Sequence, residues 1–262
     1  MNHIVKLQQQ LQKRTNPKTK IWWENYLKRT ITFRGVQMAD IRAALHLWYG
    51  QEAIRTRCST EQQKDLAIRL IQQQYCEDKL AGILFWQEIL FPSNALSWRE
   101  DLPRFAALFQ EGYIYEWNTC DWFCVRVLGP LVRREGRACA QAIAGWRHAG
   151  NLWQRRAAGV AFVNLAPKGE ANFVGFSAIL LSVCAATVKY PERFAQTGTG
   201  WVLRELSHAE PERVASFVEK HVRYFSAEGL SYAITKLPQQ TKLRLKKLHR
   251  ERNRKKALPV SF

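Results

Sequence analysis

The sequence predicts an all-helical protein built from repeated helix pairs. Apolar residues recur at helical spacing along most of the 262 residues, and no convincing alternation typical of a strand interrupts them. Trp117, Trp153 and Trp201 each stand near the start of an expected helix, 36 and 48 residues apart. Paired helices that recur roughly every 40 residues are typical of HEAT-like repeats. We therefore expect an all-α fold in which HEAT-like repeats form a curved α-solenoid with a concave basic face.

Capping residues locate the first expected helix. Asn16 supplies a cap and Pro17 a first-turn proline for a helix over residues 18–29. Its apolar stripe consists of Trp22, Trp23, Tyr26 and Leu27. A short extended stretch, broken by Gly35, is expected at residues 31–36.

Helices account for the rest of the chain up to the basic tail. Asp40 stands at the start of a helix with apolar Ile41, Leu45 and Trp48, and Ser59 opens a capping box for a helix that runs to about Tyr75. The same spacing predicts helices over residues 78–90, 98–110, 117–132, 136–148, 153–165, 173–190, 192–209, 212–224 and 227–237.

The composition is that of a large, strongly basic globular chain. With 47% hydrophobic residues the sequence is not a disordered polymer, and its length suffices to bury a core. We expect one domain over residues 1–240 and a basic tail over residues 241–262. Between Thr241 and Lys256 there are nine Lys or Arg against one Glu, so about +8 of the net charge of +18 lies in the tail. The body of the protein is therefore basic as well.

This charge indicates a polyanionic partner. Nucleic acid is the simplest one, because neutralising phosphates releases counterions, and an anionic membrane surface is the competing explanation. The tail is interpreted either as a DNA-tethering helix or disordered arm, or as a solvated segment that only raises solubility. The longest uncharged run, residues 171–188, contains Asn172, two glycines and two serines, which favours a buried helix over a membrane span. We expect a cytoplasmic monomer that binds nucleic acid and no membrane.

The cysteines and histidines show no metal-binding pattern. Six cysteines form no CxxC pair, and the histidines do not cluster with them. Cys120 and Cys124 are four residues apart, but this spacing is more typical of packing than of a zinc site. We expect reduced thiols, no metal and no cofactor.

One acidic residue beside an indole is unusual in so basic a chain. If residues 117–132 are helical, Trp117 and Asp121 share one face. Arg155, Arg156 and Trp201, if they lie on the same repeat face, would add a phosphate clamp and a second indole. A carboxylate in such a site could stabilise the sugar cation that develops when an N-glycosidic bond breaks.

Each of these residues also has a structural interpretation. Asp121 could be a first-turn acid favoured by the helix dipole, the tryptophans could be core residues, and the arginine pair could be a solvated or salt-bridged face. Composition and spacing alone predict a helical-repeat protein that binds nucleic acid.

Four segments together resemble the AlkD-type DNA alkylation repair family, HEAT-like-repeat DNA glycosylases, over most of residues 1–240. Residues 33–42 resemble aromatic-x-Gly-hydrophobic-x-x-x-acid-x-Arg, with Phe33, Gly35, Val36, Asp40 and Arg42 in place. Trp-x-x-x-Asp is matched by Trp117 and Asp121. Trp-x-x-Arg-Ala-Ala resembles the run from Trp153 through Arg156 to Ala157 and Ala158, and Gly-Trp-x-Leu-Arg-Glu matches residues 200–205.

The resemblance implies a monofunctional glycosylase that excises cationic N3- and N7-alkylated purines from duplex DNA without flipping the base into a pocket. It implies that Asp121 is the catalytic carboxylate, that Arg156 contacts the backbone, and that Trp117 and Trp201 pack on the deoxyribose of the lesion. The tail is longer and more basic than this family leads one to expect. The alternative function is a non-catalytic helical-repeat protein that binds damaged or branched DNA by charge and shape.

Overall fold

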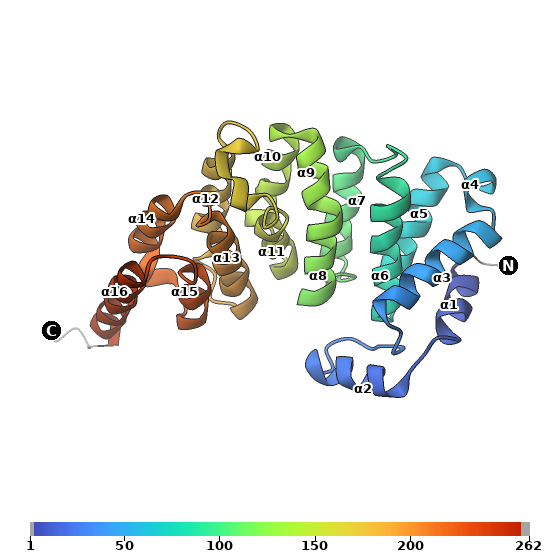
Figure 1. Ribbon diagram of the computed structural model, residues 1–262, viewed down its shortest axis with the longest axis horizontal. Coiled ribbons are helices and arrows are strands. Elements are labelled where there is room, and N and C mark those ends of the chain that lie inside the picture. Colours follow the sequence, from blue (N-terminus) through green and yellow to red (C-terminus); the bar gives the residue numbers. More distant parts are fainter. Residues whose placement is uncertain (1–2, 258–262) are drawn as a thin grey trace. The chain divides into compact units, whose positions relative to one another are not determined.

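A computed structural model describes residues 3–257, and this part of the chain is helical nearly throughout (Figure 1). Within these residues the only strand-like pairing is a single bridge between Thr32 and Tyr75, so the expected stretch at residues 31–36 forms no strand. The predicted all-α class is confirmed. No helix of the described part is both long and apolar enough to cross a lipid bilayer.

The chain divides into two compact units, Met1–Val127 and Leu128–Phe262. The elements of unit 1 are α1 His3–Gln12, α2 Pro17–Tyr26, α3 Met38–Gln51, α4 Ile54–Arg57, α5 Thr60–Ile71, α6 Cys76–Phe85, the π-helical turn η1 Trp86–Leu90, α7 Trp98–Gln110 and α8 Trp117–Phe123. A second π-helical turn, η2 Cys124–Leu128, follows α8.

The elements of unit 2 are α9 Gly129–Glu135, α10 Arg137–Gly145, η3 Trp146–His148, α11 Leu152–Val160, η4 Ala166–Ala171, α12 Phe176–Thr187, α13 Arg193–Leu206, α14 Pro211–His221, η5 Val222–Tyr224, α15 Ala227–Ala233 and α16 Gln239–Ala257. The predicted boundary at residue 240 falls within the first turn of α16.

Several helices pack on the next helix but one, as in proteins built from two-helix repeats. In unit 1, α1 contacts α3 and α6 contacts α8; in unit 2, α11 contacts α13, which contacts α15, while α10 contacts α12. Such stacking buries the side of each pair against the neighbouring pair. The predicted helical-repeat class is thus confirmed inside each unit, whereas the curvature of a solenoid and its basic concave face stay predictions.

The capping signals start helices where the sequence predicts them. The Asn16 side chain accepts hydrogen bonds from the amides of Lys18 and Thr19, at 2.9 and 3.3 Å. Ser59 and Gln62 cap each other reciprocally at the start of α5. Predicted and observed bounds also agree for α7.

The long helix predicted over residues 117–132 is interrupted. After α8 the backbone hydrogen bonds change to the π-helical pattern of η2. The α-helical pattern returns with α9 at Gly129, and Pro130 lies in the first turn of α9. Proline has no amide hydrogen to donate to the preceding turn, so a regular α-helix cannot continue through Pro130 unchanged.

The apolar stripe on α2 lies at the surface, because no residue of that helix is buried and Trp22 and Tyr26 are 57% and 55% exposed; only Leu27, just past its end, is buried. One sequence-based expectation about a tryptophan position needs correction. Trp201 is not near a helix start, because it lies in the second half of α13. The 48-residue spacing from Trp153 to Trp201 is therefore not a repeat register.

Candidate nucleic-acid site

Helix α8 is organised by a carboxylate that precedes it. Glu116 is its N-cap, and the two oxygens of this side chain accept hydrogen bonds from the amides of Asn118 and Thr119, both at 2.6 Å. Asp121 lies in the second turn, so it is not the acid that stabilises the helix N-terminus. The dipole explanation of Asp121 is therefore wrong, and Glu116 has that role.

Trp117 and Asp121 lie one turn apart on α8, which is the spacing that the sequence predicts. Both side chains are partly exposed, whereas Glu116 is buried at 2% exposure. Burial raises the pKa of Glu116 against the opposing effect of its amide hydrogen bonds, and the nearby charge of Asp121 raises it further. Helix α8 therefore has a buried carboxylate at its N-cap, Glu116, and a partly exposed carboxylate in its second turn, Asp121.

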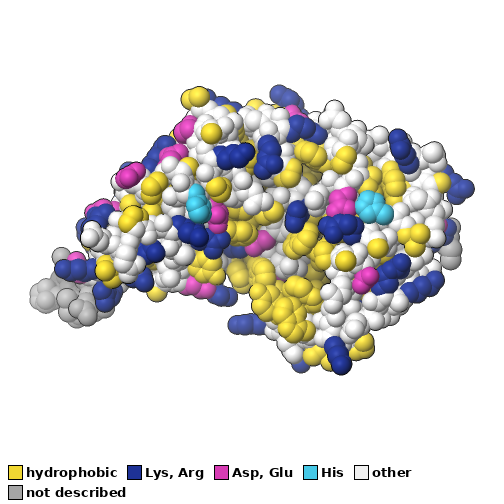
Figure 2. Space-filling view, viewed as in Figure 1, with side chains coloured by type: hydrophobic (Ala, Val, Ile, Leu, Met, Phe, Trp, Pro, Cys, Tyr) yellow, Lys and Arg dark blue, Asp and Glu magenta, His cyan; other side chains and the backbone are white. Residues whose placement is uncertain are grey.

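An aromatic cluster adjoins Trp117. Tyr26 contacts the Trp117 ring edge to face at 5.7 Å, and Trp22 stacks on Tyr26 with centroids 5.1 Å apart. Trp22 also meets Trp23 edge to face at 4.8 Å, and Trp23 stacks on the buried Phe33. Hydrophobic side chains gather at the surface beside α2 (Figure 2). Because Trp22 and Tyr26 stay more than half exposed, the parts of their rings outside this stack are available to a partner.

The connection from α2 to α3 holds this aromatic cluster in place. Gly35 has a φ of +91°, and a Cβ there would collide with the carbonyl oxygen of Asn16. The Glu77 carboxylate accepts hydrogen bonds from three successive amides, those of Arg34, Gly35 and Val36, at 2.7 to 3.0 Å. The first family-like segment therefore positions α2.

Arg34 strengthens the same attachment. Its guanidinium donates to both oxygens of the fully buried Asp78, at 3.0 and 2.8 Å, and lies 4.0 Å from the centroid of the Tyr75 ring. A bidentate pair between arginine and carboxylate fixes both partners in orientation.

A buried lysine ties down the loop that leads into α8. Lys79 is 2% exposed, and its Nζ donates to the carbonyls of Ile71 and Tyr113 at 2.8 and 2.9 Å. Removal of this ammonium group from water lowers the pKa of Lys79 from 10.5 to about 8, although nearby acidic groups oppose the change.

In unit 2, Arg155 is part of the interior. It is 5% exposed, and its guanidinium donates to the carbonyls of Ala149 and Gly150 and to Glu192 at 2.6 Å. The same group lies 4.1 Å from the centroid of the Tyr190 ring. Its role as a DNA contact stays a prediction, and it requires Arg155 to leave these partners.

Arg156 is also buried, at 7% exposure. It donates to the Phe194 carbonyl at 2.8 Å and reaches the Thr197 hydroxyl at 3.4 Å. Both partners belong to α13, so Arg156 joins α11 to the helix that carries Trp201.

Trp201 is partly exposed on α13. Its indole nitrogen donates to Glu205 at 3.2 Å, and Glu205 also accepts from Arg204 at 2.6 Å. The neighbouring Gly200 permits close packing, because a Cβ there would come within 2.6 Å of the Gly229 carbonyl on α15. Within unit 2 the structure thus brings Arg156 and Trp201 to one helix pair, and within unit 1 it brings Trp117 and Asp121 together.

The thiols behave as packing residues. Five of the six free cysteines are buried, and Cys58 is half-buried. Burial raises the pKa of Cys139 to about 12 and raises that of Cys76 well above its usual value. Across residues 3–257, no group of three or more His, Cys, Asp or Glu side chains is arranged to bind a metal ion.

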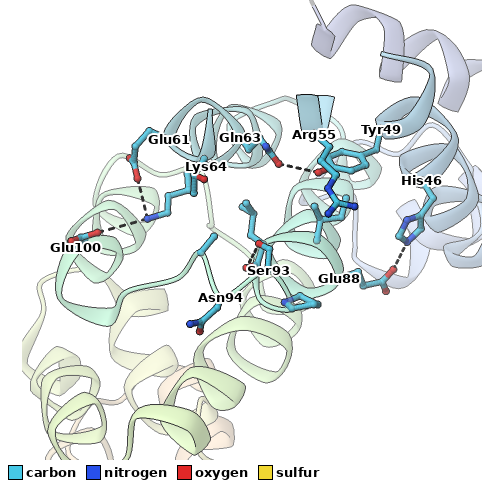
Figure 3. A pocket seen from close by; sticks show the side chains of 15 residues that line it. His46, Tyr49, Arg55, Glu61, Gln63, Lys64, Glu88, Ser93, Asn94 and Glu100 are labelled. Carbon is cyan, nitrogen blue, oxygen red and sulfur yellow. Dashed lines mark hydrogen bonds and ion pairs between the residues drawn. The ribbon is translucent and has the colours of Figure 1, made fainter. Parts of the chain in front are cut away.

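An open pocket of about 860 Å³ lies elsewhere in unit 1 (Figure 3). Several of its charged side chains are paired: Glu88 accepts from Arg42 and His46, and Lys64 lies 3.1 Å from Glu61. None of the sequence-predicted site residues lines this pocket. Its chemistry is therefore separate from that of α8.

Two kinds of residue escape the sequence analysis. The sequence shows that Trp22 and Tyr26 belong to an apolar stripe. Only the structure shows that both side chains are exposed and that Tyr26 contacts Trp117. Their flanking by Lys18, Lys20, Lys28 and Arg29 is a signal that favours a surface over a core. Glu116 and Glu77 carry no such signal, because glutamate is seldom an N-cap or a clamp for loop amides.

Comparisons with known proteins agree with this architecture. The solved structure described as "Predicted DNA alkylation repair enzyme from Enterococcus faecalis" has a TM-score of 0.70 and 19% identity, covering 86% of this chain and 98% of that chain. At this identity the likeness shows the fold alone. No curated protein sequence matches at a significant level. The sequence profile of the family described as DNA alkylation repair enzyme matches residues 7–237, well over half of the chain. The chain therefore belongs to the DNA alkylation repair enzyme family.

Proposed function

We propose that this protein is a monofunctional DNA glycosylase that removes cationic N3- and N7-alkylated purines from duplex DNA, with Asp121 as its catalytic carboxylate. One observation carries the proposal: Trp117 and Asp121 lie one turn apart on α8, partly exposed, beside the exposed rings of Tyr26 and Trp22. Membership of a DNA alkylation repair family and the net charge of +18 support the choice of DNA.

The proposed reaction needs only one carboxylate. The bond between C1′ of the deoxyribose and the purine nitrogen breaks, and its electron pair goes to the base. Because alkylation has made the base cationic, it leaves as a neutral molecule. The sugar becomes an oxocarbenium ion, which a negative charge at Asp121 stabilises. Water then adds to C1′ and loses a proton, which completes hydrolysis.

Other residues hold the DNA. The indole of Trp117 offers a face for the deoxyribose, and the rings of Tyr26 and Trp22 extend that apolar surface. Trp201 and Arg156 remain proposed DNA contacts of unit 2. Arg156 acts through the helix pair that it stabilises unless its guanidinium is released from Phe194 and Thr197.

Base release from alkylated duplex DNA tests the proposal. Wild type should liberate 7-methyl- or 3-methylpurine, and Asp121→Asn should lower the single-turnover rate by on the order of 100-fold or more. Affinity for the same duplex should stay within roughly threefold, because one surface carboxylate contributes little to binding. Undiminished release by Asp121→Asn would remove this residue from the mechanism.

Asp65→Asn is the matched control. Asp65 is an exposed aspartate of α5, and the same substitution there should leave the rate unchanged. If wild type binds DNA tightly and in a salt-dependent way but releases no base from any alkylated substrate, the protein is instead a non-catalytic binder of DNA.

A further inference from the structure

The C-terminal helix carries the densest positive charge of the chain. α16 contains nine Lys or Arg residues and one Glu. It begins at Gln239, beyond residues 7–237, which match the family profile. This helix is therefore not accounted for by what the chain shares with its family.

α16 is packed against other helices of unit 2. It packs against α14 and η5, with Leu245 completely buried. His249 is 9% exposed, and its Nε2 donates to the Phe225 carbonyl at 2.8 Å. Arg244 donates to Glu219 of α14 at 2.6 Å. These contacts hold the helix in one place, whereas a flexible arm would make no such contacts.

The opposite face of α16 is a cationic surface, made by Lys246, Lys247 and Arg250. All three side chains are exposed, and the Lys247 side chain is 75% exposed. Lys246 and Arg250 are one turn apart, which places them about 6 Å apart along the helix axis. Glu251 is the one acidic residue in α16, and it lies 4.0 Å from Lys247.

We infer that this cationic surface binds the phosphate backbone of duplex DNA and extends the footprint of the protein beyond the family region. Lysine and arginine ammonium and guanidinium groups bind phosphate oxygens without reading the sequence. The surface carries no aromatic side chain for base stacking, so we expect no base preference. The inference rests on the proposed function only for the identity of DNA as the partner.

The helix is poorly suited to a membrane surface. A helix that lies in a bilayer interface needs a broad apolar face opposite its cations. In α16 that face is already used within the protein, because Leu245 is buried and Leu248 is half-buried. Leu243, at 59% exposure, is the one strongly exposed apolar side chain among residues 239–253. The charge pattern therefore favours DNA over lipid.

The test replaces Lys246, Lys247 and Arg250 together by glutamine in the full-length protein. Affinity for an undamaged duplex is measured over a range of salt concentrations. Loss of three phosphate contacts should lower the slope of log K against log salt by about 2 to 3 and weaken binding at least about tenfold at low salt. An unchanged slope overturns the inference.

A matched control removes the same charge elsewhere. Arg57, Arg69 and Arg133 are exposed cations on α4, α5 and α9, and their replacement by glutamine should change the slope by less than about 1. If both triple variants lose the same slope, only net charge matters and the specific surface is refuted.

A second variant separates a docked helix from a tether. Leu245→Asn keeps every cation but removes the buried anchor, so affinity should fall several-fold while circular dichroism shows that the rest of the protein stays folded. Unchanged affinity would show that α16 acts as a flexible arm and would overturn the docked geometry.

Two further measurements separate a failure of this inference from a failure of the proposed glycosylase activity and from binding to lipid. Single-turnover base excision at saturating protein should be unchanged in the glutamine variant, since Asp121 is intact; if wild type excises nothing, the binding slopes still decide the role of α16. Sedimentation with phosphatidylserine vesicles tests lipid. If the glutamine variant loses vesicle binding but keeps its DNA slope, α16 serves a membrane and the inference is wrong.

Discussion

Two tryptophan segments that look alike in the sequence have different surroundings in the structure. Trp117 and Asp121 on α8 are partly exposed and adjoin exposed rings of α2. In the segment that follows Trp153, Arg155 and Arg156 are buried and donate to backbone carbonyls of unit 2. The first segment leaves side chains partly exposed, whereas the second holds helices together. A motif match therefore identifies which residues correspond to the family motif, and their burial indicates whether each one is accessible or holds the fold together.

The sharpest test of this contrast is Arg155→Ala. It leaves the carbonyls of Ala149 and Gly150 without their donor, so the free energy of unfolding should fall by about 3 kcal/mol. The melting temperature should drop by roughly 6 to 12 °C. Arg133→Ala, at an exposed position on α9, should change it little. A stable Arg155→Ala protein with weakened DNA binding would instead make Arg155 a DNA contact.

The pH dependence of stability tests the buried Lys79 of unit 1. The folded pKa of Lys79, about 8, lies below its ordinary 10.5, so the unfolded chain binds more protons between these values. The contribution of Lys79 to stability should therefore rise from pH 8 to pH 10.5, on the order of 2 kcal/mol. Urea unfolding of wild type and Lys79→Met across this range measures the difference between the two. A constant difference would contradict the lowered pKa.

Glu116→Ala tests whether capping of α8 by Glu116 supports Asp121, which lies on the same helix. The amides of Asn118 and Thr119 lose their acceptor, and α8 should lose about 1 to 2 kcal/mol of stability. Glu116→Gln keeps one acceptor oxygen and should lose less. Thermal melts give the stability of both variants. If base excision falls equally in the two variants while their stabilities differ, the charge of Glu116, rather than its capping, matters for Asp121.

Trp22→Ala should have the smallest effect on stability. This side chain is 57% exposed, so unfolding should change by within about 0.5 kcal/mol. DNA affinity should nevertheless fall about fivefold or more if the ring stacks on the substrate. Leu47→Ala, at an exposed apolar position on α3, is the control. Equal affinity of both variants with wild type would leave the aromatic cluster without a part in binding.

Much of the fold follows from sequence signals that act locally. Asn16 and Ser59 start helices by capping, and Ile41, Leu45 and Trp48 become buried as their spacing predicts. The π-helical turn at Cys124–Leu128 was not predicted, because the apolar pattern runs through it and only Pro130 indicates a break.

The candidate site is harder to predict because exposure depends on distant contacts. The apolar stripe of α2 has the spacing of a core helix, yet Trp22 and Tyr26 remain at the surface. The two arginines of α11 have the composition of a phosphate clamp, yet α13 lies close enough to bury Arg156. Pairing of helices in space, which no local pattern encodes, decides both outcomes.

The attachment of α2 has a consequence for how this protein could be altered. The helix contributes no buried side chain, and Glu77 secures its loop through backbone amides, which are common to all residues except proline. Side chains on the outer surface of α2 can therefore be exchanged at little cost to folding. A library that randomises Ile21, Trp22 and Tyr26 should yield mostly folded proteins, from which variants with altered DNA affinity could be selected.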